Sequence, residues 1–252
     1  MSLLELSNVG FSYDRRSQTL DDVSFTVTEG RSVGLIGESG SGKSTILKLM
    51  LGLSRQQSGE ITFEGRPLDL SSGAFMRDYR RKVQAVFQDP YSSLDPRQKV
   101  KSIISEPLRS LKIPGNHDQI VAEALSAVGL PEEALTRYPH AFSGGQRQRI
   151  AIARAIAAQP KLLLADEAVS ALDLSTRILI VDLFRKLSER MTLVFVSHDL
   201  GVVAALCEEM VILEKGQIVE TGNTQDIIAN PRHPYTRKLL ESIPRMPCAM
   251  KS

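Results

Sequence analysis

Residues 37–45 read GESGSGKST, and this stretch decides the fold that the sequence predicts. It has P-loop spacing, because Gly37 and Gly42 enclose four residues and Lys43-Ser44 follow directly. The apolar run over 33–36 is typical of a buried strand, and the run over 46–51 is typical of a helix. Glycines let several N–H groups face one anion, and the helix start adds a positive dipole end. The stretch therefore predicts a phosphate site in an α/β fold.

The side chains of this loop supply further contacts to a nucleotide. Lys43 offers a mobile cation to the outer phosphates, and Ser44 offers a hydroxyl to Mg²⁺. Nucleotide contacts are predicted at Gly37, Ser39, Gly40, Ser41, Gly42, Lys43, Ser44 and Thr45. The alternative is a glycine-rich turn that matches by chance, and the strand before and helix after argue against it.

The bulk composition is that of an ordinary globular protein. The 252 residues include 31 basic and 29 acidic side chains, so the net charge is only +2, which argues against a nucleic-acid partner. No apolar run reaches the length of about eighteen residues that predicts a membrane span. The N-terminus lacks the basic start and apolar core of a signal peptide. Cys207 and Cys248 lie far apart without metal-ligand spacing, which favours a reduced cytosolic chain.

The pattern along the chain alternates between strand-rich and helix-rich parts. Short strands are predicted over 3–6, 23–27, 59–63 and 83–87, and mostly helices and loops over 90–160, including helices over 120–128 and 144–158. Buried strands follow over 161–165 and 192–196, then a hairpin over 209–220 and two short helices. Between the buried strands, Leu174, Ile178, Val181, Phe184 and Leu187 recur at helical spacing, so we expect this face to pack on the sheet.

Two further groups of residues carry chemistry. Asp166-Glu167 ends a buried strand, at the edge where ligands bind in open α/β sheets. Asp166 can hold Mg²⁺ and Glu167 can polarise an attacking water, the alternative being a solvated pair. The opening Phe142-Ser143-Gly144-Gly145-Gln146 offers a hydroxyl and backbone N–H groups to a second anion. Its alternative is a plain Ser N-cap with glycines that permit close packing.

Taken together, these motifs resemble the nucleotide-binding subunits of ABC transporters over nearly the whole chain. Residues 37–45 resemble the Walker A loop, Gln88 the Q-loop glutamine, and residues 143–146 the signature motif, with Phe142 where Leu is commoner. Residues 162–166 resemble Walker B, Glu167 the catalytic glutamate, residues 170–173 the D-loop and His198 the switch histidine. Tyr13 resembles the aromatic that stacks on adenine, and packing is its alternative role.

The resemblance implies a fold and a domain organisation. A P-loop NTPase core with a RecA-like parallel sheet would carry an N-terminal antiparallel β-subdomain and a helical insert. We expect a single ABC ATPase domain over 1–252. Its β-subdomain and core would take 1–89 and 160–230, its helical subdomain 90–159, and a short extension 231–252.

The resemblance also implies a head-to-tail dimer that binds ATP and Mg²⁺. Ser44, Gln88 and Asp166 would hold the metal, while Lys43, Gln88, Glu167 and His198 would serve catalysis. Ser143, Gly144, Gly145 and Gln146 would bind the partner's nucleotide, and Asp173 would join the two sites. The dimer would drive separate membrane permease subunits, fed by an extracytoplasmic substrate-binding protein. The subunit would lie peripherally on the cytoplasmic face of the inner or plasma membrane.

Three segments indicate a subgroup of ABC transporters. Residues 87–97 (FQDPYSSLDPR), 137–140 (RYPH) and 233–236 (HPYT) are similar to those of importers of peptides, nickel or metallophores. The chain departs from that pattern at Ala141, where Glu is usual, and at Ala168, where Pro is common. Some members carry an iron–sulfur cluster, but Cys248 alone cannot supply four thiolates. The sequence leaves both peptide and metal open as cargo. The second cassette of the dimer can be an identical chain or a paralogue, and we favour a paralogue.

The sequence leaves two other functions open. A soluble ABC-type ATPase acting on ribosomes or nucleic acid is the main alternative, but such chains usually have two cassettes or a coiled coil. A regulatory module that does not hydrolyse ATP is disfavoured by Glu167 and His198. Six basic side chains are expected to be solvated: Arg77, Arg80, Arg81, Lys82, Arg147 and Arg149.

Overall fold

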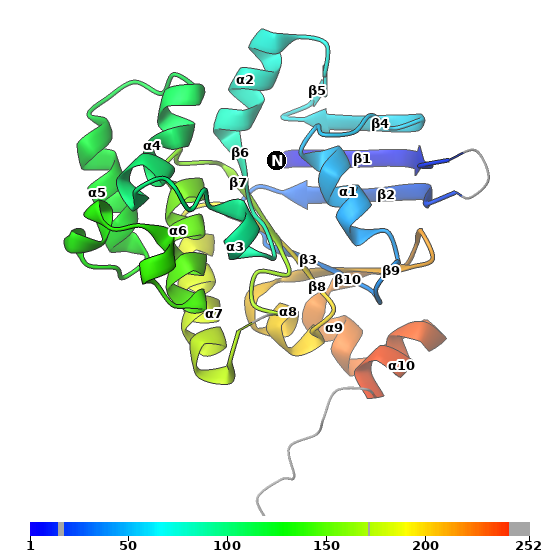
Figure 1. Ribbon diagram of the computed structural model, residues 1–252. Coiled ribbons are helices and arrows are strands. Elements are labelled where there is room, and N and C mark those ends of the chain that lie inside the picture. Colours follow the sequence, from blue (N-terminus) through cyan, green and yellow to red (C-terminus); the bar gives the residue numbers. More distant parts are fainter. Residues whose placement is uncertain (15–17, 171, 242–252) are drawn as a thin grey trace, which may run out of the picture.

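The computed structural model describes residues 1–14, 18–170 and 172–241, and it contains two sheets and a helical region (Figure 1). The smaller sheet is antiparallel and has the order β2-β1-β4-β5. Its strands are β1 (Ser2–Phe11), β2 (Leu20–Thr28), β4 (Ser58–Phe63) and β5 (Arg66–Pro67). The predicted N-terminal antiparallel β-subdomain is therefore present.

The larger sheet has six strands in the order β10-β9-β3-β8-β7-β6. They are β3 (Val33–Ile36), β6 (Val83–Val86), β7 (Leu162–Asp166), β8 (Thr192–Ser197), β9 (Glu209–Glu214) and β10 (Gln217–Asn223). All neighbours are parallel except β9 and β10, which form the predicted hairpin. Every residue of β3 and β8 is buried, as parallel strands covered on both faces require. The predicted α/β class with a parallel core sheet is confirmed.

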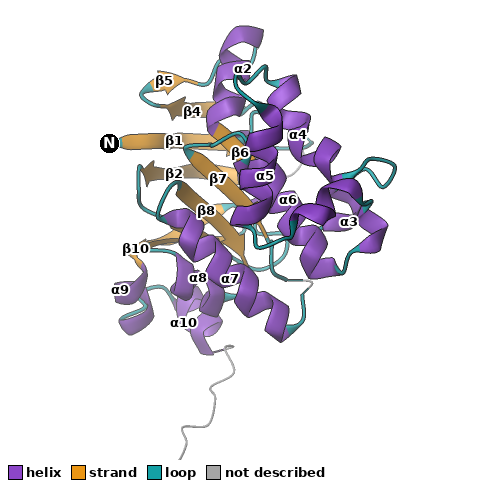
Figure 2. Ribbon diagram, turned by 90° about the vertical axis from the view of Figure 1, so that its left-hand side faces the viewer, coloured by secondary structure: helices purple, strands orange, loops and turns teal. Residues whose placement is uncertain are grey.

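Helices cover this sheet and form the insert on one side of the molecule (Figures 1 and 2). The α-helices are α1 (Lys43–Met50), α2 (Gly73–Lys82), α3 (Pro90–Ser93), α4 (Val100–Ser110), α5 (His117–Ala127), α6 (Gly144–Ile156), α7 (Leu174–Ser188), α8 (Leu200–Leu206), α9 (Thr224–Ala229) and α10 (Pro234–Glu241). Two 3₁₀ helices, η1 (Glu132–Thr136) and η2 (Pro139–Ala141), precede α6. No helix among the described residues is both long enough and apolar enough to cross a membrane.

The strands of the larger sheet divide their side chains between two hydrophobic cores. Leu163 and Phe195 face the core shared with the helical insert, α7 and α8. Leu164 and Val194 face the core shared with α1 and the antiparallel sheet. This alternation follows from the period of two along a strand. Burial on both faces fixes the strand register, and hence the position of the segments that follow each strand.

Two expectations about surfaces are wrong in part. Helix α7 buries Phe184 and Leu187, but Leu174 and Ile178 are 72% and 55% exposed. All buried positions of α7 lie at or after Ile180, so its first turns extend beyond the core. Arg81 is also not simply solvated, because its guanidinium donates to the carbonyls of Leu111 and Lys112. It thereby joins α2 to the end of α4.

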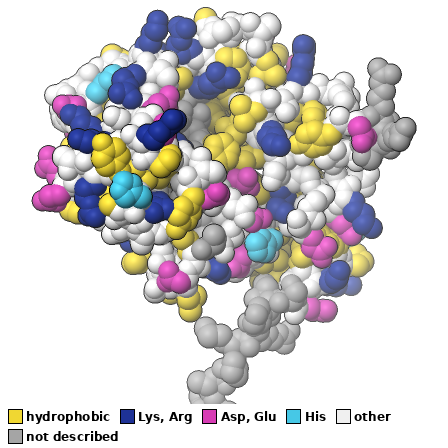
Figure 3. All heavy atoms as spheres, in the orientation of Figure 1, with side chains coloured by type: hydrophobic (Ala, Val, Ile, Leu, Met, Phe, Trp, Pro, Cys, Tyr) yellow, Lys and Arg dark blue, Asp and Glu magenta, His cyan; other side chains and the backbone are white. Residues whose placement is uncertain are grey.

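Two more of the basic side chains expected to be solvated have partners. Lys82 pairs with Glu64 at 2.9 Å and with Asp78 at 3.1 Å. Arg147 lies over the Tyr91 ring, 4.2 Å from its centroid, and donates to the carbonyl of Pro139. On the face shown in Figure 3, basic and acidic side chains are interspersed.

Candidate nucleotide site

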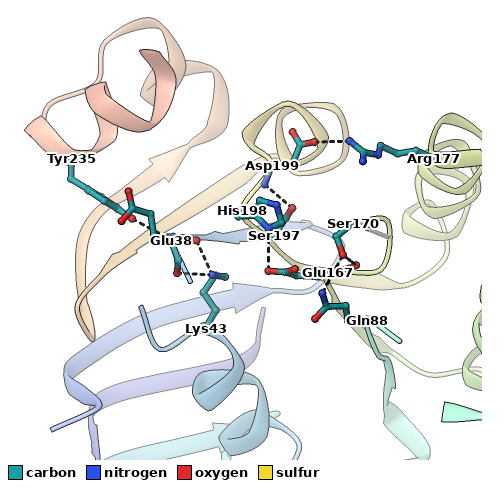
Figure 4. Close-up of polar contacts among 11 residues, drawn as sticks. Glu38, Lys43, Gln88, Glu167, Ser170, Arg177, Ser197, His198, Asp199 and Tyr235 are labelled. Atoms are coloured by element: carbon teal, nitrogen blue, oxygen red, sulfur yellow. Dashed lines mark hydrogen bonds and ion pairs between the residues drawn. The ribbon is translucent and has the colours of Figure 1, made fainter. Parts of the chain in front are cut away.

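The carboxyl ends of four neighbouring strands meet at one edge of the larger sheet. Strands β3, β8, β7 and β6 are adjacent and parallel, so the segments after them lie along that edge. The last residue of β7 is Asp166, and the segments after the four strands carry Lys43, His198, Glu167 and Gln88. Figure 4 shows four of these residues, Lys43, Glu167, His198 and Gln88, in one region. The topology thus brings together predicted site residues that are far apart in the sequence.

The P-loop backbone is shaped to receive an anion. Gly40 and Gly42 have φ angles of 80° and 109°, a region that glycine adopts without steric cost. Helix α1 starts after Gly42, and no side chain caps its first turn. A Cβ on Gly37 would lie 2.3 Å from the Leu213 carbonyl oxygen, so the close approach there requires glycine. Uncapped N–H groups at a helix start fit a phosphate.

The hydroxyl groups of the loop differ in their surroundings. Ser39 and Ser44 are exposed, so the Ser44 hydroxyl is open to a ligand. Ser41 is buried, and its Oγ has no hydrogen-bond partner among the described residues. Thr45 is buried, and its Oγ1 lies 3.2 Å from the Tyr13 hydroxyl.

Lys43 is held inside the loop by backbone carbonyls. Its Nζ donates to the carbonyl of Gly37 at 2.7 Å and to that of Glu38 at 2.9 Å. Burial lowers the pKa of Lys43, and the nearby charges of Glu167 and Asp166 act in the opposite direction. A buried ammonium bonded to neutral carbonyls gains from an anion, so this environment fits a phosphate.

Asp166 and Glu167 place two carboxylates beside that ammonium. Burial raises the pKa of Asp166, the charge of Glu167 raises it further, and Lys43 opposes both. The backbone of Glu167 is left-handed, with φ of 43°, and its N–H donates to the Val196 carbonyl at 2.9 Å. Its Oε1 lies 3.1 Å from Nδ1 of His198 (Figure 4). Non-glycine residues in this conformation are uncommon.

Gln88 and Tyr13 flank this centre. The side chain of Gln88 is exposed, and its Nε2 donates to Oγ of Ser170 at 3.4 Å. Tyr13 is 60% exposed, its ring and that of Phe11 form a T-shaped pair, and Nζ of Lys48 lies 5.5 Å from its ring centroid. The bond to Thr45 contributes most to lowering the pKa of Tyr13. An exposed ring fixed beside α1 is available to stack on a base.

The residues available to a metal ion are few. Asp166 supplies a carboxylate and Ser44 an exposed hydroxyl, both oxygen ligands of the kind that Mg²⁺ takes. The described residues include no group of three His, Cys, Asp or Glu side chains that could hold a metal. The donor set therefore fits Mg²⁺ that is held largely by phosphate oxygens and water, as in P-loop enzymes.

The signature residues lie on the helical side, apart from α1 (Figure 1). Ser143 and Gln146 form a capping box: Ser143 Oγ accepts from the Gln146 N–H, and Gln146 Oε1 accepts from the Ser143 N–H. A Cβ on Gly145 would lie 2.2 Å from Cγ2 of Thr176. The Ser143 N-cap and the close packing at Gly145, which were the alternative to an anion site, are thus both present. The structure does not bring these residues to the chain's own P-loop.

The two glycines of this motif give a matched test of packing. Gly145→Ala should lower the free energy of unfolding by about 1–3 kcal/mol, because the added methyl overlaps Thr176 between α6 and α7. Gly144→Ala should leave it unchanged or raise it slightly, because the nearest atom to a Cβ there is 3.9 Å away and alanine favours a helix. Urea denaturation of both variants measures the difference. Equal stabilities would contradict the close contact.

The D-loop is described in part, since Ala171 lies outside the described residues. Asp173 caps α7 by accepting from the Thr176 N–H at 3.0 Å, and it also accepts from Oγ of Ser175. These hydrogen bonds, that from Ser175 foremost, hold the pKa of Asp173 well below its usual value. Of the departures, Ala168 is buried in the core and Ala141 is exposed. Cys248 also lies outside the described residues.

Some functional contacts were not predicted from the sequence. Ser170 accepts a hydrogen bond from Gln88, and Thr176 packs against Gly145. The sequence assigns residue 170 only to the D-loop and Thr176 to no motif, so neither contact could be predicted. Tyr235 accepts a hydrogen bond from the N–H of Glu38 in the P-loop. Its segment, 233–236, resembles that of the importer subgroup, but the sequence assigns it no role in the site.

Two family models match the chain. The model described as ABC transporter matches residues 20–170, and the model described as oligopeptide/dipeptide transporter, C-terminal region, matches residues 219–250. The first spans the P-loop, the signature motif and the β7 carboxylates. The second begins within β10 and spans α9 and α10.

Two similar proteins and a solved structure agree with these models. A putative peptide import ATP-binding protein of Brucella ovis is 44% identical over 249 residues, covering 96% of this chain and 78% of the relative. The oligopeptide transport ATP-binding protein OppF of Streptococcus mutans is 42% identical over 251 residues, which cover 96% of this chain and 82% of OppF. The solved structure of the dimeric ATP-binding cassette MJ0796, bound to ADP and Pi in a post-hydrolysis state, matches with a TM-score of 0.78 and 30% identity. The match covers 88% of this chain and 99% of the cassette. The chain therefore belongs to the ABC transporter family, among its ATP-hydrolysing cassettes.

Proposed function

We propose that this chain is the motor subunit of a peptide importer and hydrolyses MgATP at an interface with a second cassette. The observation that carries the proposal is the convergence of Lys43, Asp166, Glu167 and His198 at one edge of the sheet. The names of the relatives, which are peptide import and oligopeptide transport proteins, support peptide over nickel as cargo.

Each residue at this edge of the larger sheet has its own role in ATP hydrolysis. Lys43 exchanges its two carbonyl partners for β- and γ-phosphate oxygens, which neutralises charge in a buried position. Glu167 takes a proton from the attacking water, and His198 holds the Glu167 carboxylate and contacts the γ-phosphate. Bound Mg²⁺, held by Ser44, Gln88 and Asp166, would neutralise charge that develops on the phosphates. Tyr13 stacks on adenine.

The second cassette completes each site. The N–H groups and hydroxyl at the start of α6 (Ser143, Gly144, Gly145 and Gln146) bind the γ-phosphate on the partner's P-loop. Asp173 lies at the junction between the two sites. That the solved cassette MJ0796 is dimeric supports this pairing. The γ-phosphate then acts as the switch, because its release removes the contacts that bridge the subunits.

The remaining assignments follow from an importer's architecture. We propose one domain over 1–252, with the helical subdomain over 90–159 receiving a permease subunit. The chain would lie peripherally at the cytoplasmic face of the membrane and meet the substrate-binding protein only indirectly. Its partner cassette would be a paralogue.

Uptake measurements test the cargo. Deleting the gene should reduce uptake of a labelled oligopeptide to background while uptake of labelled Ni²⁺ is unchanged. The wild-type gene should restore peptide uptake, and Glu167→Gln should not, because the subunit would then bind ATP without turning it over. Unchanged peptide uptake after deletion would contradict the proposal, and loss of nickel uptake alone would assign metal cargo instead.

A further inference from the structure

Helix α10 contacts the P-loop through Tyr235. This residue is only 7% exposed, and its hydroxyl oxygen accepts a hydrogen bond from the N–H of Glu38 at 2.9 Å, across 197 positions of sequence (Figure 4). Lys238, one turn further along α10, lies 3.5 Å from the Glu38 carboxylate. That ion pair is largely exposed and therefore weak. The buried phenol is the stronger contact between the helix and the loop.

The peptide unit between Gly37 and Glu38 is held from both sides. Its N–H donates to Tyr235, and its carbonyl, that of Gly37, accepts from Nζ of Lys43 at 2.7 Å. Hydrogen bonds in such a chain polarise one another. When Lys43 moves to the phosphates, the carbonyl loses its partner and the Tyr235 bond remains. The phenol can then keep this peptide in the orientation that the bound loop needs.

Helix α10 is itself anchored to the sheet by three hydrogen bonds to one carboxylate, that of Glu220. Glu220 on β10 accepts from the N–H of Arg232 at 2.9 Å, from the N–H of His233 at 3.0 Å and from Oγ1 of Thr236 at 2.6 Å. The carboxylate lies at the start of α10, where an acidic group is favoured by the helix dipole. Pro234 at the first helical position adds a fixed φ. The position of Tyr235 is therefore set by β10.

We infer that Tyr235 is a positioning residue for the nucleotide: α10, anchored by Glu220, braces the Gly37-Glu38 peptide and pre-forms the phosphate cradle. The inference rests on the proposed function, because it takes the P-loop as the ATP site. It assigns a role to the segment that matches the oligopeptide/dipeptide transporter C-terminal model, which lies outside the ABC transporter match. A brace of this kind affects nucleotide affinity more than the chemical step.

Tyr235→Phe tests the brace because it removes only the hydroxyl. The dissociation constant for a fluorescent ATP analogue, measured on the full chain, should rise about three- to tenfold, the range of a single hydrogen bond. The KM for ATP should rise equally while kcat at saturating ATP stays within about twofold. Tyr138→Phe is the matched control, since Tyr138 stacks on His140 away from the loop and should bind like wild type.

A second variant acts at a distance from the nucleotide. Glu220→Gln removes an acceptor oxygen at the start of α10 and should also raise the dissociation constant for the ATP analogue. Circular dichroism at 25 °C should show that the ligand-free variant is still folded. A wild-type constant in either Tyr235→Phe or Glu220→Gln would overturn the brace, as would an equal rise in Tyr138→Phe. If wild-type protein does not bind the analogue, the proposed function itself is overturned; if it binds and Tyr235→Phe binds equally, only the brace is.

Discussion

Replacing Glu167 with glutamine should lower kcat for ATP hydrolysis by about two to four orders of magnitude, the range for removing a general base. The amide keeps the shape of the side chain and can still bond His198, which lies 3.1 Å from Oε1. It cannot accept the proton of the attacking water. A phosphate-release assay at saturating ATP measures the loss.

ATP binding should survive the same change, because Lys43 and the P-loop backbone are untouched. Removing a negative charge beside Asp166 also reduces repulsion of the phosphates. Glu189→Gln is the matched control: Glu189 is exposed at the end of α7, and the variant should hydrolyse ATP at the wild-type rate. Wild-type turnover in Glu167→Gln would show that another group is the base.

The core of the fold was predictable because buried parallel strands have a strong sequence signature. The run over 33–36 and the run over 192–196 correspond to β3 and β8, whose residues are all buried. The same strands end at the P-loop and at His198, so the position of the chemistry follows from the order of the strands. Predicting the sheet and predicting the candidate site were therefore one inference.

Side-chain environments at the ends of helices were less predictable. Leu174 and Ile178 share the helical spacing of Phe184, yet they lie beyond the core, and periodicity alone does not show where a sheet ends. The sequence groups Arg81 with a solvated cluster, because it does not reveal that the carbonyls of Leu111 and Lys112, just after α4, accept from its guanidinium. The contact between Tyr235 and Glu38 depends on tertiary docking, which no local pattern records.

Gly144→Glu, introduced into Glu167→Gln, should raise the dissociation constant of the ATP-bound dimer at least about tenfold. The added carboxylate would face the partner's γ-phosphate, and like charges at an interface cost several kcal/mol. The monomer should stay stable, because space is open at Gly144 and an acidic group is favourable at the start of α6. Gly144→Gln, of equal size and neutral, is the control. Equal dimerisation of the two variants would place the signature residues away from the nucleotide.

Sedimentation velocity of Glu167→Gln tests the pairing of two cassettes most directly. With MgATP, the chain should shift from monomer to a species of twice the mass, either alone or mixed with the paralogous ATPase that we propose as its partner. ADP should not cause the shift. If the protein binds ATP yet remains monomeric in both mixtures, the start of α6 does not meet a partner's phosphate and the shared-site account is contradicted.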